Sequence, residues 1–380
     1  MKANRQARQV AASLLSLGLP IAPCEATTAP QEGLAEFRLM HYQETQEGTR
    51  RMQIKAQSSR FILPVSDQIS AELSQVVDAV SGASPLYYTD PAVFANVRDL
   101  RQARDLKLSI HGEREKLSLG ANLSEERDYH SRTQSLAYNW RSPSQLISID
   151  LAHAQSKDLI NPVNQLVRDE KKTWRDYLIA ATVVLSPRDL LQVQRTSGSG
   201  SGYFSDPYKL LDRRPDDRNI QAWVIRWHHY HPALQTSSRL SLRRLNDSFG
   251  IRSDTLQWEL AKRLGESDTL TPGLRLYSQR AAYFFSPPNP ERPELPNLPS
   301  DFQLGRSFLS FDQRLSQFGA INLSLKWEHA FGKSVVDLRM DYYLQKNKWS
   351  WHGPGSPGLA DFSAMTWQLG WRRPFDRLSF

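Results

Sequence analysis

The feature that most constrains this chain is a strict alternation of apolar and polar residues between positions 309 and 328. Its odd positions, from Leu309 to Trp327, are mostly apolar, whereas its even positions are mostly polar or charged. Because successive side chains of a β-strand point to opposite faces, this period of two predicts one strand with an apolar face and a polar face. Strands of globular proteins span roughly 3 to 10 residues, so a single strand of this length predicts a membrane barrel. The alternative is two ordinary strands that meet at 317–319.

Shorter segments with the same alternation recur along the chain and, with 309–328, bring the count to sixteen. They lie at 37–41, 52–56, 69–77, 106–110, 117–123, 136–140, 147–151, 177–185, 191–193, 223–227, 240–242, 256–260, 274–276, 336–342 and 365–371. No run of about 18 to 20 apolar residues exists, which excludes a helical membrane span. We therefore predict an all-β fold, a single antiparallel transmembrane β-barrel of about sixteen strands, with fourteen as the alternative. A soluble β-sandwich also alternates, but its outward faces need fewer Trp and Leu residues.

The connections between these segments alternate between short and long. Short turns fall at 141–144, 186–188, 231–233, 264–268 and 331–333. Longer connections fall at 81–103, 155–172, 195–219, 284–308 and 346–361, with two short ones on the same side at 125–128 and 246–250. Outer-membrane barrels have short periplasmic turns, longer extracellular loops and an even number of strands. That parity requires 309–328 to be one strand, because splitting it would place the loops 284–308 and 346–361 on opposite sides.

The N-terminus has the pattern of a secretory signal peptide. Three basic residues precede a mostly apolar stretch at 10–22, and small residues occupy the last and third-last positions before a cleavage site after Ala26. We therefore assign 1–26 to a signal peptide and 27–380 to the barrel. The predicted location is the outer membrane of a Gram-negative bacterium.

Cys24, the single cysteine of the chain, offers an alternative reading as the lipidated residue of a lipoprotein, and Pro23 directly before it argues against this. Cleavage after Ala26 would remove Cys24, so the mature chain would use no disulfide and no cysteine-ligated metal. It would also remove three basic residues and one acid, so the formal net charge falls from +8 to +6. This mild excess forms no Lys/Arg block of the kind that binds nucleic acid. The expected partners are outer-membrane lipids and lipopolysaccharide, and the barrel-assembly machinery during insertion; no protein partner follows from the sequence.

Charged residues predicted to face the lumen carry both signs, and arginine outnumbers the acids. They are Arg226, His228, Arg239, Arg243, Glu259, Arg263, Arg275, Asp312, Arg314, Lys326, Glu328, Asp337, Arg339, Asp341 and Arg372. A structural network of paired charges that props the barrel open or fills it would account for them. The functional alternative is a selectivity surface that favours anionic solutes, because the arginine excess makes the lumen positive.

The histidine cluster at 227–231 lies near the predicted periplasmic rim. On a strand, His229 and His231 share a face and His228 lies opposite, so the three cannot ligate one metal ion. We predict no metal and no other cofactor. Serines are numerous, but none stands out by its spacing from a histidine and a third polar group, so we also predict no enzyme activity.

Two segments of the predicted loops carry distinctive compositions. Residues 197–202 alternate Ser and Gly but lack the Lys-Ser/Thr that follows a phosphate-binding loop, so we predict a flexible outside loop. The stretch 212–218 mixes acids with arginines, which predicts a solvated loop held by internal ion pairs; calcium or lipopolysaccharide binding is the alternative. The candidate loop residues are Asp206, Tyr208, Arg214, Asp216 and Arg218.

Short motifs at or near these loops also point to a family. They are Ser81-Gly82-Ala83-Ser84-Pro85, Asp128-Tyr129-His130-Ser131, Gly202-Tyr203, Asp206-Pro207-Tyr208-Lys209, Arg214-Pro215 with Arg218, Gly250-Ile251-Arg252-Ser253 with Thr255, Tyr277-Ser278-Gln279 with Ala281-Ala282, and Asp312 with Arg314-Leu315-Ser316. In these motifs the chain resembles an uncharacterised family of proteobacterial outer-membrane proteins, the domain of unknown function 3570. It departs from the family at Ser248-Phe249, where an aspartate and a tryptophan are usual, and at Leu276, where a second aromatic is usual. The resemblance implies a barrel in the outer membrane and supplies no reaction.

These observations lead to one expected function and two alternatives. We expect a channel or transporter with a polar lumen for small solutes, with a preference for anions. Closing a barrel of this strand number leaves an interior wide enough for water unless loops plug it, and the outside loops could fold inward as a constriction. The alternatives are a non-conducting barrel that anchors or helps to assemble other envelope proteins, and a barrel that hydrolyses lipids.

Overall fold

A computed structural model describes residues 28–82, 97–209, 211–289, 291 and 297–377. The predicted signal peptide and its cleavage site after Ala26 lie outside the described residues. So does the part of the predicted loop 81–103 between 83 and 96.

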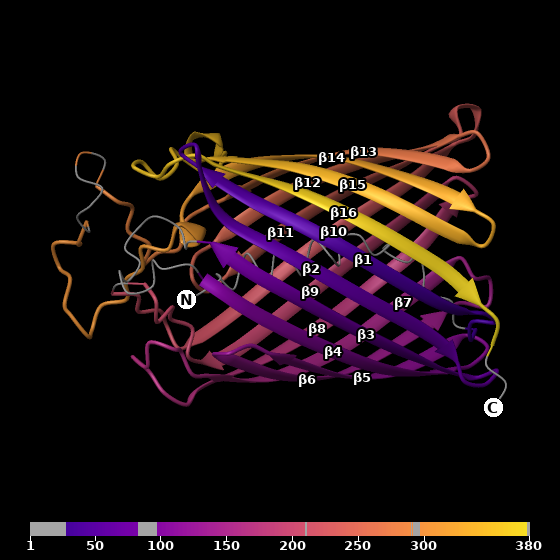
Figure 1. The fold of residues 1–380 in the computed structure, drawn as a ribbon, viewed down its shortest axis with the longest axis horizontal. Coiled ribbons are helices and arrows are strands. Elements are labelled where there is room, and N and C mark those ends of the chain that lie inside the picture. The colour runs from indigo at the N-terminus through magenta and orange to yellow at the C-terminus, as the bar shows by residue number, and fades with distance from the viewer. Residues whose placement is uncertain (1–27, 83–96, 210, 290, 292–296, 378–380) are drawn as a thin grey trace.

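Sixteen β-strands follow one another along the described chain. They are β1 (Gly33–Gln46), β2 (Thr49–Pro64), β3 (Ile69–Gly82), β4 (Val97–His111), β5 (Glu115–Glu125), β6 (Tyr129–Arg141), β7 (Ile147–Ile160), β8 (Glu170–Ser186), β9 (Asp189–Gly202), β10 (Asp217–His231), β11 (Thr236–Asp247), β12 (Arg252–Leu264), β13 (Asp268–Gln279), β14 (Phe318–Phe331), β15 (Ser334–Lys346) and β16 (Phe362–Phe375). Each strand pairs antiparallel with the next, and β16 pairs with β1, which closes the barrel (Figure 1). The predicted closed antiparallel barrel of sixteen strands is confirmed.

The alternation of the sequence becomes the two faces of the barrel wall. On β1, Phe37 and Leu39 are 43 % and 57 % exposed, whereas Arg38 between them is 5 % exposed. The exposed apolar side chains form the outward face, where lipid replaces water and burial of apolar area is favourable. The buried polar side chains form the inward face. None of the helical segments in the described part of the chain is long and apolar enough to cross a membrane.

The two ends of the barrel differ in the length of their connections. The chain enters β1 and leaves β16 at the end that carries the short turns, such as 187–188 and 332–333. The opposite end carries the longer loops 203–216, 280–317 and 347–361, which Figure 1 shows gathered on one side. In outer-membrane barrels the short-turn end, which also holds the termini, faces the periplasm. The longer loops therefore belong to the extracellular mouth.

A repeated aromatic cluster lies on the strands at the periplasmic rim. Asp189 of β9 accepts hydrogen bonds from Trp227 Nε1 at 3.0 Å and contacts His229 Nδ1 at 2.7 Å. Asp268 of β13 accepts from Trp327 Nε1 at 2.8 Å and contacts His329 Nδ1 at 3.0 Å. Amphipathic rings with a satisfied polar edge suit the boundary between hydrocarbon and headgroups. These clusters give His229 and His329 a structural role on the outer face.

The prediction that 309–328 forms one strand is wrong. The strand β14 begins at Phe318, and a short 3-10 helix, η3 (Gln313–Leu315), interrupts the chain before it. The Asp312 side chain accepts a hydrogen bond from the Arg314 backbone N–H and caps this helix, which turns the chain away from an extended course. The barrel still has sixteen strands, because residues 309–317 belong to the loop and add no strand to the sheet.

The prediction that 197–202 is a flexible loop is also wrong, because these residues form the end of β9. Gly198 and Gly200 lie beneath the indole of Trp174 on the neighbouring strand β8. A Cβ atom at position 198 would come within 2.6 Å of Trp174 Cζ2, and one at position 200 within 2.8 Å of the Thr173 carbonyl oxygen. The glycines leave room for the tryptophan, which packs over them as aromatic residues do over glycines in sheets.

Candidate functional site

The structure places most of the predicted lumen residues on the inner face of the wall. They are Arg226 and His228 of β10, Arg239 and Arg243 of β11, Glu259 and Arg263 of β12, Arg275 of β13, Lys326 and Glu328 of β14, Asp337, Arg339 and Asp341 of β15, and Arg372 of β16. Each lies one residue from an outward side chain, as Arg226 does between Ile225 and Trp227, which are 45 % and 39 % exposed. Arg263 lies at the periplasmic end and donates to the Glu266 carbonyl oxygen at 3.3 Å.

Many basic residues of the inner wall are paired with acids. Pairs between different strands are Arg38 with Asp337 at 3.3 Å, Arg60 with Glu36 at 2.9 Å and Glu72 at 2.7 Å, Lys172 with Asp158 at 2.7 Å, and Arg372 with Glu328 at 3.4 Å. Pairs within one strand are Arg339 with Asp341 at 2.8 Å and Lys326 with Glu328 at 3.0 Å. The partners neutralise one another, and the pairs between strands also brace the wall.

Apart from Arg263 at the periplasmic end, three arginines on the β10–β13 wall have no acid within ion-pair distance among the described residues. They are Arg226, Arg243 and Arg275. Arg226 is held by neutral amides, since its Nη1 donates to Gln192 Oε1 at 2.6 Å and to Gln194 Oε1 at 2.9 Å. The nearest acid along this wall, Glu259, is shared by Arg239 at 3.7 Å and Arg339 at 4.0 Å. The β10–β13 wall therefore carries uncompensated positive charge.

The strand register gathers two of these arginines with two tyrosines. Arg243 on β11 lies opposite Thr255 on β12, and Thr255 lies opposite Tyr277 on β13. Arg275 precedes Tyr277 by two residues on the same face and lies opposite Asn322 on β14, which in turn lies opposite Tyr343 on β15. An arginine and tyrosine surface results on the extracellular half of the inner wall.

Loops fold together at the extracellular mouth. We use the name mouth cap for the described residues of the segments 203–216, 248–251 and 280–317. Arg213 and Leu309 exchange backbone hydrogen bonds of 2.8 and 2.9 Å, and the Ser310 N–H donates to the Phe284 carbonyl oxygen at 3.0 Å. An apolar cluster of Phe249, Ile251, Ala282, Phe284 and Leu315 lies beneath these contacts. Phe249 of this cluster is 1 % exposed.

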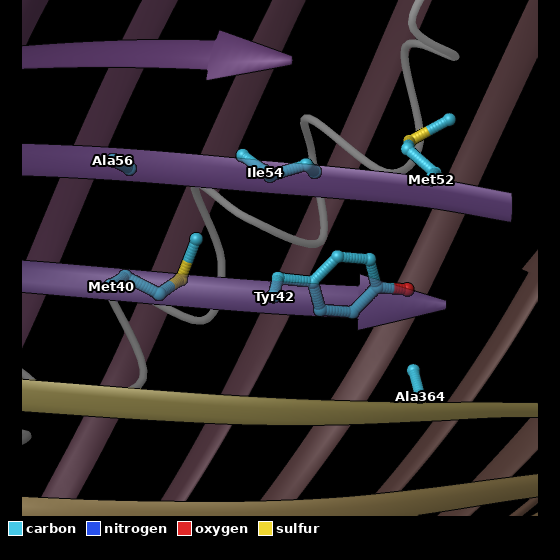
Figure 2. Close-up of a cluster of buried hydrophobic side chains, with 6 residues drawn as sticks. All are labelled: Met40, Tyr42, Met52, Ile54, Ala56 and Ala364. Carbon is cyan, nitrogen blue, oxygen red and sulfur yellow. The ribbon is translucent and has the colours of Figure 1, made fainter. Parts of the chain in front are cut away.

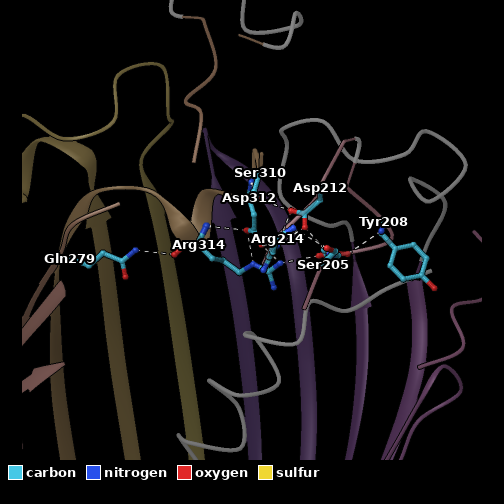
Figure 3. A network of polar contacts seen from close by, with 9 residues as sticks. Ser205, Tyr208, Asp212, Arg214, Gln279, Ser310, Asp312 and Arg314 are labelled. Carbon is cyan, nitrogen blue, oxygen red and sulfur yellow. Dashed lines mark hydrogen bonds and ion pairs between the residues drawn. The ribbon is translucent and has the colours of Figure 1, made fainter. Parts of the chain in front are cut away.

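A buried network of opposite charges ties the mouth cap together (Figure 3). Asp312, which is 0 % exposed, accepts from Arg214 Nη2 at 2.8 Å and from Arg314 Nε at 2.6 Å. Arg214 also contacts Asp212 at 2.8 Å, and Arg314 contacts Asp206 at 2.9 Å. Each arginine thus bridges two aspartates, one of them two positions away in the sequence and the other 98 positions away for Arg214 and 108 for Arg314.

Burial and the neighbouring arginines shift the pKa values of the network's carboxylates in opposite directions. Burial tends to raise the pKa of Asp312, but the guanidinium groups of Arg314 and Arg214 outweigh it and hold that pKa far below the usual range. Burial raises the pKa of Asp212, and Arg214 offsets only part of this effect. Burial also lowers the pKa of the Lys209 ammonium group, which lies beside the same aspartates. The surroundings therefore favour the charged form of Asp312 and disfavour that of Asp212.

The mouth cap lies on the inner side of the wall. Gln279, at the end of β13, donates to the backbone carbonyl oxygens of Arg314 at 2.9 Å and Ser316 at 2.6 Å. Gln46, at the end of β1, donates to Gln313 Oε1 at 3.3 Å. Since β13 and β1 are separated by three strands, the segment 313–316 crosses part of the mouth.

Two expectations about charged residues change as a result. Asp312 and Arg314 do not lie on a barrel strand as predicted, because η3 takes them into the mouth cap. The stretch 212–218 has the expected internal ion pairs and exposes Arg213, Asp216 and Asp217, but the side chains of Asp212 and Arg214 are shielded from solvent in the charge network. Among the candidate loop residues, Asp206, Tyr208, Arg214 and Asp216 belong to the mouth cap, and Asp216 is exposed. Arg218 lies on β10, where it pairs with Asp247 and stacks 4.6 Å from the Phe249 ring centroid.

The described residues contain little that suggests catalysis. Ser70 Oγ and His111 Nε2 lie 2.8 Å apart, a pair that sequence spacing did not reveal because the residues belong to adjacent strands. Both are buried, so this pair does not face the lipid that a lipid hydrolase would cleave. Within the described ranges no three His, Cys, Asp or Glu side chains converge as metal ligands.

The closed barrel, its apolar outer face and its loop-covered mouth define an outer-membrane β-barrel. Residues 89–366 match the family described as a protein of unknown function (DUF3570), and the chain belongs to this family. The resemblance seen in the loop motifs is thereby confirmed. No curated protein is significantly similar to this chain in sequence.

Solved outer-membrane proteins share the fold at low sequence identity. A bacterial polysaccharide outer membrane secretin matches with a TM-score of 0.53 and 8 % identity, over 90 % of this chain and 98 % of that one. The siderophore receptor PirA from Pseudomonas aeruginosa matches with a TM-score of 0.46 and 12 % identity over 90 % of this chain, which spans 62 % of that receptor. OccAB4 from Acinetobacter baumannii gives a TM-score of 0.45 and 6 % identity, over 92 % of this chain and 100 % of that one. Such likeness concerns the fold and assigns no solute.

Proposed function

We propose that the protein is an outer-membrane channel that passes small anionic solutes. The observation that carries the proposal is the set of Arg226, Arg243 and Arg275, which lack an acidic partner among the described residues of the inner wall. A closed barrel of sixteen strands has an interior wide enough for water. Fixed positive charge along such a passage raises the local concentration of anions and favours their passage over that of cations.

The mouth cap adds a size limit to this proposal. Residues 313–316 cross part of the mouth between β13 and β1, and buried ion pairs hold them in place. A rigid constriction of this kind admits small solutes and delays large ones. The paired charges of the mouth cap neutralise one another, so the preference for anions comes from the wall.

The test is the reversal potential of the refolded protein in a planar bilayer under a potassium chloride gradient. We expect step-like currents whose reversal potential lies closer to the equilibrium potential of chloride than to that of potassium. Replacing Arg226, Arg243 and Arg275 together by glutamine should move the reversal potential toward the equilibrium potential of potassium. Arg275→Gln alone and its matched control, Arg263→Gln at the periplasmic rim, each remove one positive charge from the same wall, and the control should shift the reversal potential less. Cation preference of the unmodified protein would contradict the proposal.

The second candidate is a non-conducting barrel that anchors other envelope proteins. The specific observation in its favour is the mouth cap, because loops that cross a mouth can also close it. This candidate predicts that protein folded by circular dichroism carries no current while residues 281–317 are present, and carries current only after they are replaced by a short turn.

We further propose that residues 1–26 are a signal peptide removed during export to the outer membrane of a Gram-negative bacterium. The support is the basic start, the apolar stretch at 10–22 and the small residues before Thr27. N-terminal sequencing of protein purified from outer membranes should then begin at Thr27.

A further inference from the structure

We infer that Arg243 and Arg275, with Tyr277 and Tyr343, form a binding site for an amphipathic organic anion that carries a carboxylate beside an aromatic or short apolar group. The inference names the solute class of the proposed channel and rests on that proposed function for its biological meaning. The site combines positive charge with an aromatic surface at the same height of the barrel.

The anion-binding half of the site consists of donors without partners. Arg243 and Arg275 have no acid within ion-pair distance among the described residues. The Nε of Arg275 and the Oγ1 of Thr255 are shielded from solvent and have no hydrogen-bond partner. Buried polar atoms are normally paired, so these atoms indicate a place where an oxyanion would complete the hydrogen bonding. Guanidinium groups suit carboxylates because they can donate two parallel hydrogen bonds.

The apolar half of the site consists of ring surfaces. Tyr277 and Phe318 have ring centroids 5.6 Å apart, and Tyr343 and Phe362 have centroids 5.8 Å apart. The hydroxyl groups donate to Gln279 at 2.6 Å and to Gln345 at 2.8 Å. Since these hydroxyls are occupied, the tyrosines offer ring surface to a ligand rather than hydrogen bonds.

The aromatic surface continues into an apolar cluster on the neighbouring strands. Met40, Tyr42, Met52, Ile54, Ala56 and Ala364 form this cluster on β1, β2 and β16, and Tyr343 and Phe362 pack against it (Figure 2). The interior of a membrane barrel is ordinarily polar. An apolar and aromatic stretch next to unpaired arginines is the combination that binds an anion with an apolar body, because ligand sites join apolar surface to a few placed polar groups.

The other arginines near this site already have partners, which distinguishes them from Arg243 and Arg275. Arg226 adds positive charge but is held by Gln192 and Gln194, so it attracts the ligand without contacting it. Arg239 and Arg339 already share Glu259. Inorganic phosphate could engage the two free guanidinium groups but would leave the tyrosine rings without a role.

The test is calorimetric titration of the full refolded protein with four probes: benzoate, acetate, inorganic phosphate and benzyl alcohol. We expect saturable binding of benzoate about tenfold tighter than that of acetate, and none of benzyl alcohol, because the site requires both charge and ring. Arg275→Gln and Arg243→Gln should each weaken benzoate about tenfold by removing charged hydrogen bonds. Tyr343→Ala should weaken benzoate but not acetate, with Tyr277→Ala as the second variant. Arg263→Gln, the matched control, should bind benzoate like the unmodified protein.

The possible results test the binding site independently of the proposed channel function. Equal affinity for phosphate and benzoate would overturn the amphipathic ligand, and undiminished benzoate binding by Arg275→Gln in protein folded by circular dichroism would overturn the site. Calorimetry detects binding whether or not the barrel conducts ions. Benzoate binding by a barrel that is silent in bilayers would therefore support the site and reject the channel, whereas anion currents without benzoate binding would do the reverse.

Discussion

Asp312 carries the largest electrostatic burden of any single residue in the mouth cap. Its carboxylate is fully buried and accepts hydrogen bonds from two arginines of different loops, Arg214 and Arg314. A buried charge is tolerated only when it is paired, and removal of one partner leaves the other uncompensated. Asp212 differs, because burial raises its pKa and so favours the neutral form.

Asp312→Asn should therefore loosen the mouth cap far more than Asp212→Asn. We expect a loss of about 3 to 5 kcal/mol in the free energy of opening for Asp312→Asn, the usual cost of breaking a buried ion pair, and a smaller loss for Asp212→Asn. Amide hydrogen exchange of residues 309–317 measures this free energy. Equal exchange in the two variants would show that the charge of Asp312 is not required.

The same residues give the pH dependence of the mouth cap. The folded pKa of Asp312 lies below its ordinary value of 3.8, so its stabilisation is present above pH 3.8 and is lost only as the pH falls through the lower folded value. The folded pKa of Asp212 is raised, so its contribution has the opposite sign and improves as the pH falls. Exchange at 309–317, corrected for intrinsic rates, should not accelerate between pH 7 and pH 4. Faster exchange near pH 6 would show that another titratable group governs the stability of the mouth cap.

At the scale of elements, β8 and β9 show how a strand of serine and glycine becomes part of a barrel. The outward serines carry little apolar surface, and the inward Gly198 and Gly200 receive the indole of Trp174. The indole Nε1 donates to Asp176 Oδ1 at 2.8 Å, which satisfies its only donor. The alternation of small residues therefore serves packing on the inner wall.

Gly200→Val should destabilise the barrel by about 1 to 3 kcal/mol, because extra methyl groups would displace the Trp174 ring and crowd the Thr173 backbone. Ser199→Val is the matched control on the outward face of the same strand, where a larger apolar side chain gains contact with lipid. Urea unfolding in detergent compares the two. If both variants unfold at the same urea concentration, the packing of Trp174 against the glycines does not contribute to the stability of the barrel.

At the scale of the whole molecule, a barrel braced by ion pairs is combined with a cap made of its own loops. Some wall pairs join adjacent strands of the closed sheet, such as Lys172 of β8 with Asp158 of β7, and others span one strand, such as Arg38 of β1 with Asp337 of β15. The mouth cap has its own apolar cluster and charge network. The barrel should therefore fold without the part of the cap that lies between β13 and β14.

Replacement of residues 281–317 by a short Gly/Ser turn should leave the strand content unchanged and raise the single-channel conductance. The physical reason is that the segment 313–316, which crosses part of the mouth, is removed while every strand keeps its neighbours. Circular dichroism and planar-bilayer recordings check the two halves of the prediction. Unchanged conductance of a folded variant would place the narrowest point elsewhere.

The strand pattern of this protein could be predicted from the sequence because the period of two is a local property. Every alternating segment except 309–328 lies in one strand, and the wall residues follow from the same parity, apart from Asp312 and Arg314. Even the error at 309–317 has a local cause. Leu309, Phe311 and Leu315 are 2 %, 0 % and 3 % exposed in the loop region, so their apolar character serves burial among loops rather than contact with lipid.

The mouth cap and the binding surface depend on tertiary structure. Arg214 meets Asp312 only because closure of the barrel brings the loops after β9 and β13 together. Which arginines remain unpaired is likewise decided by neighbours across strands, as the contrast between Arg239 and Arg243 shows. The sequence by itself thus determined the strands, their two faces and the even count, since these need only residue order. The tertiary structure alone decided which charges cancel and which remain free, since that depends on distances between segments far apart in the chain.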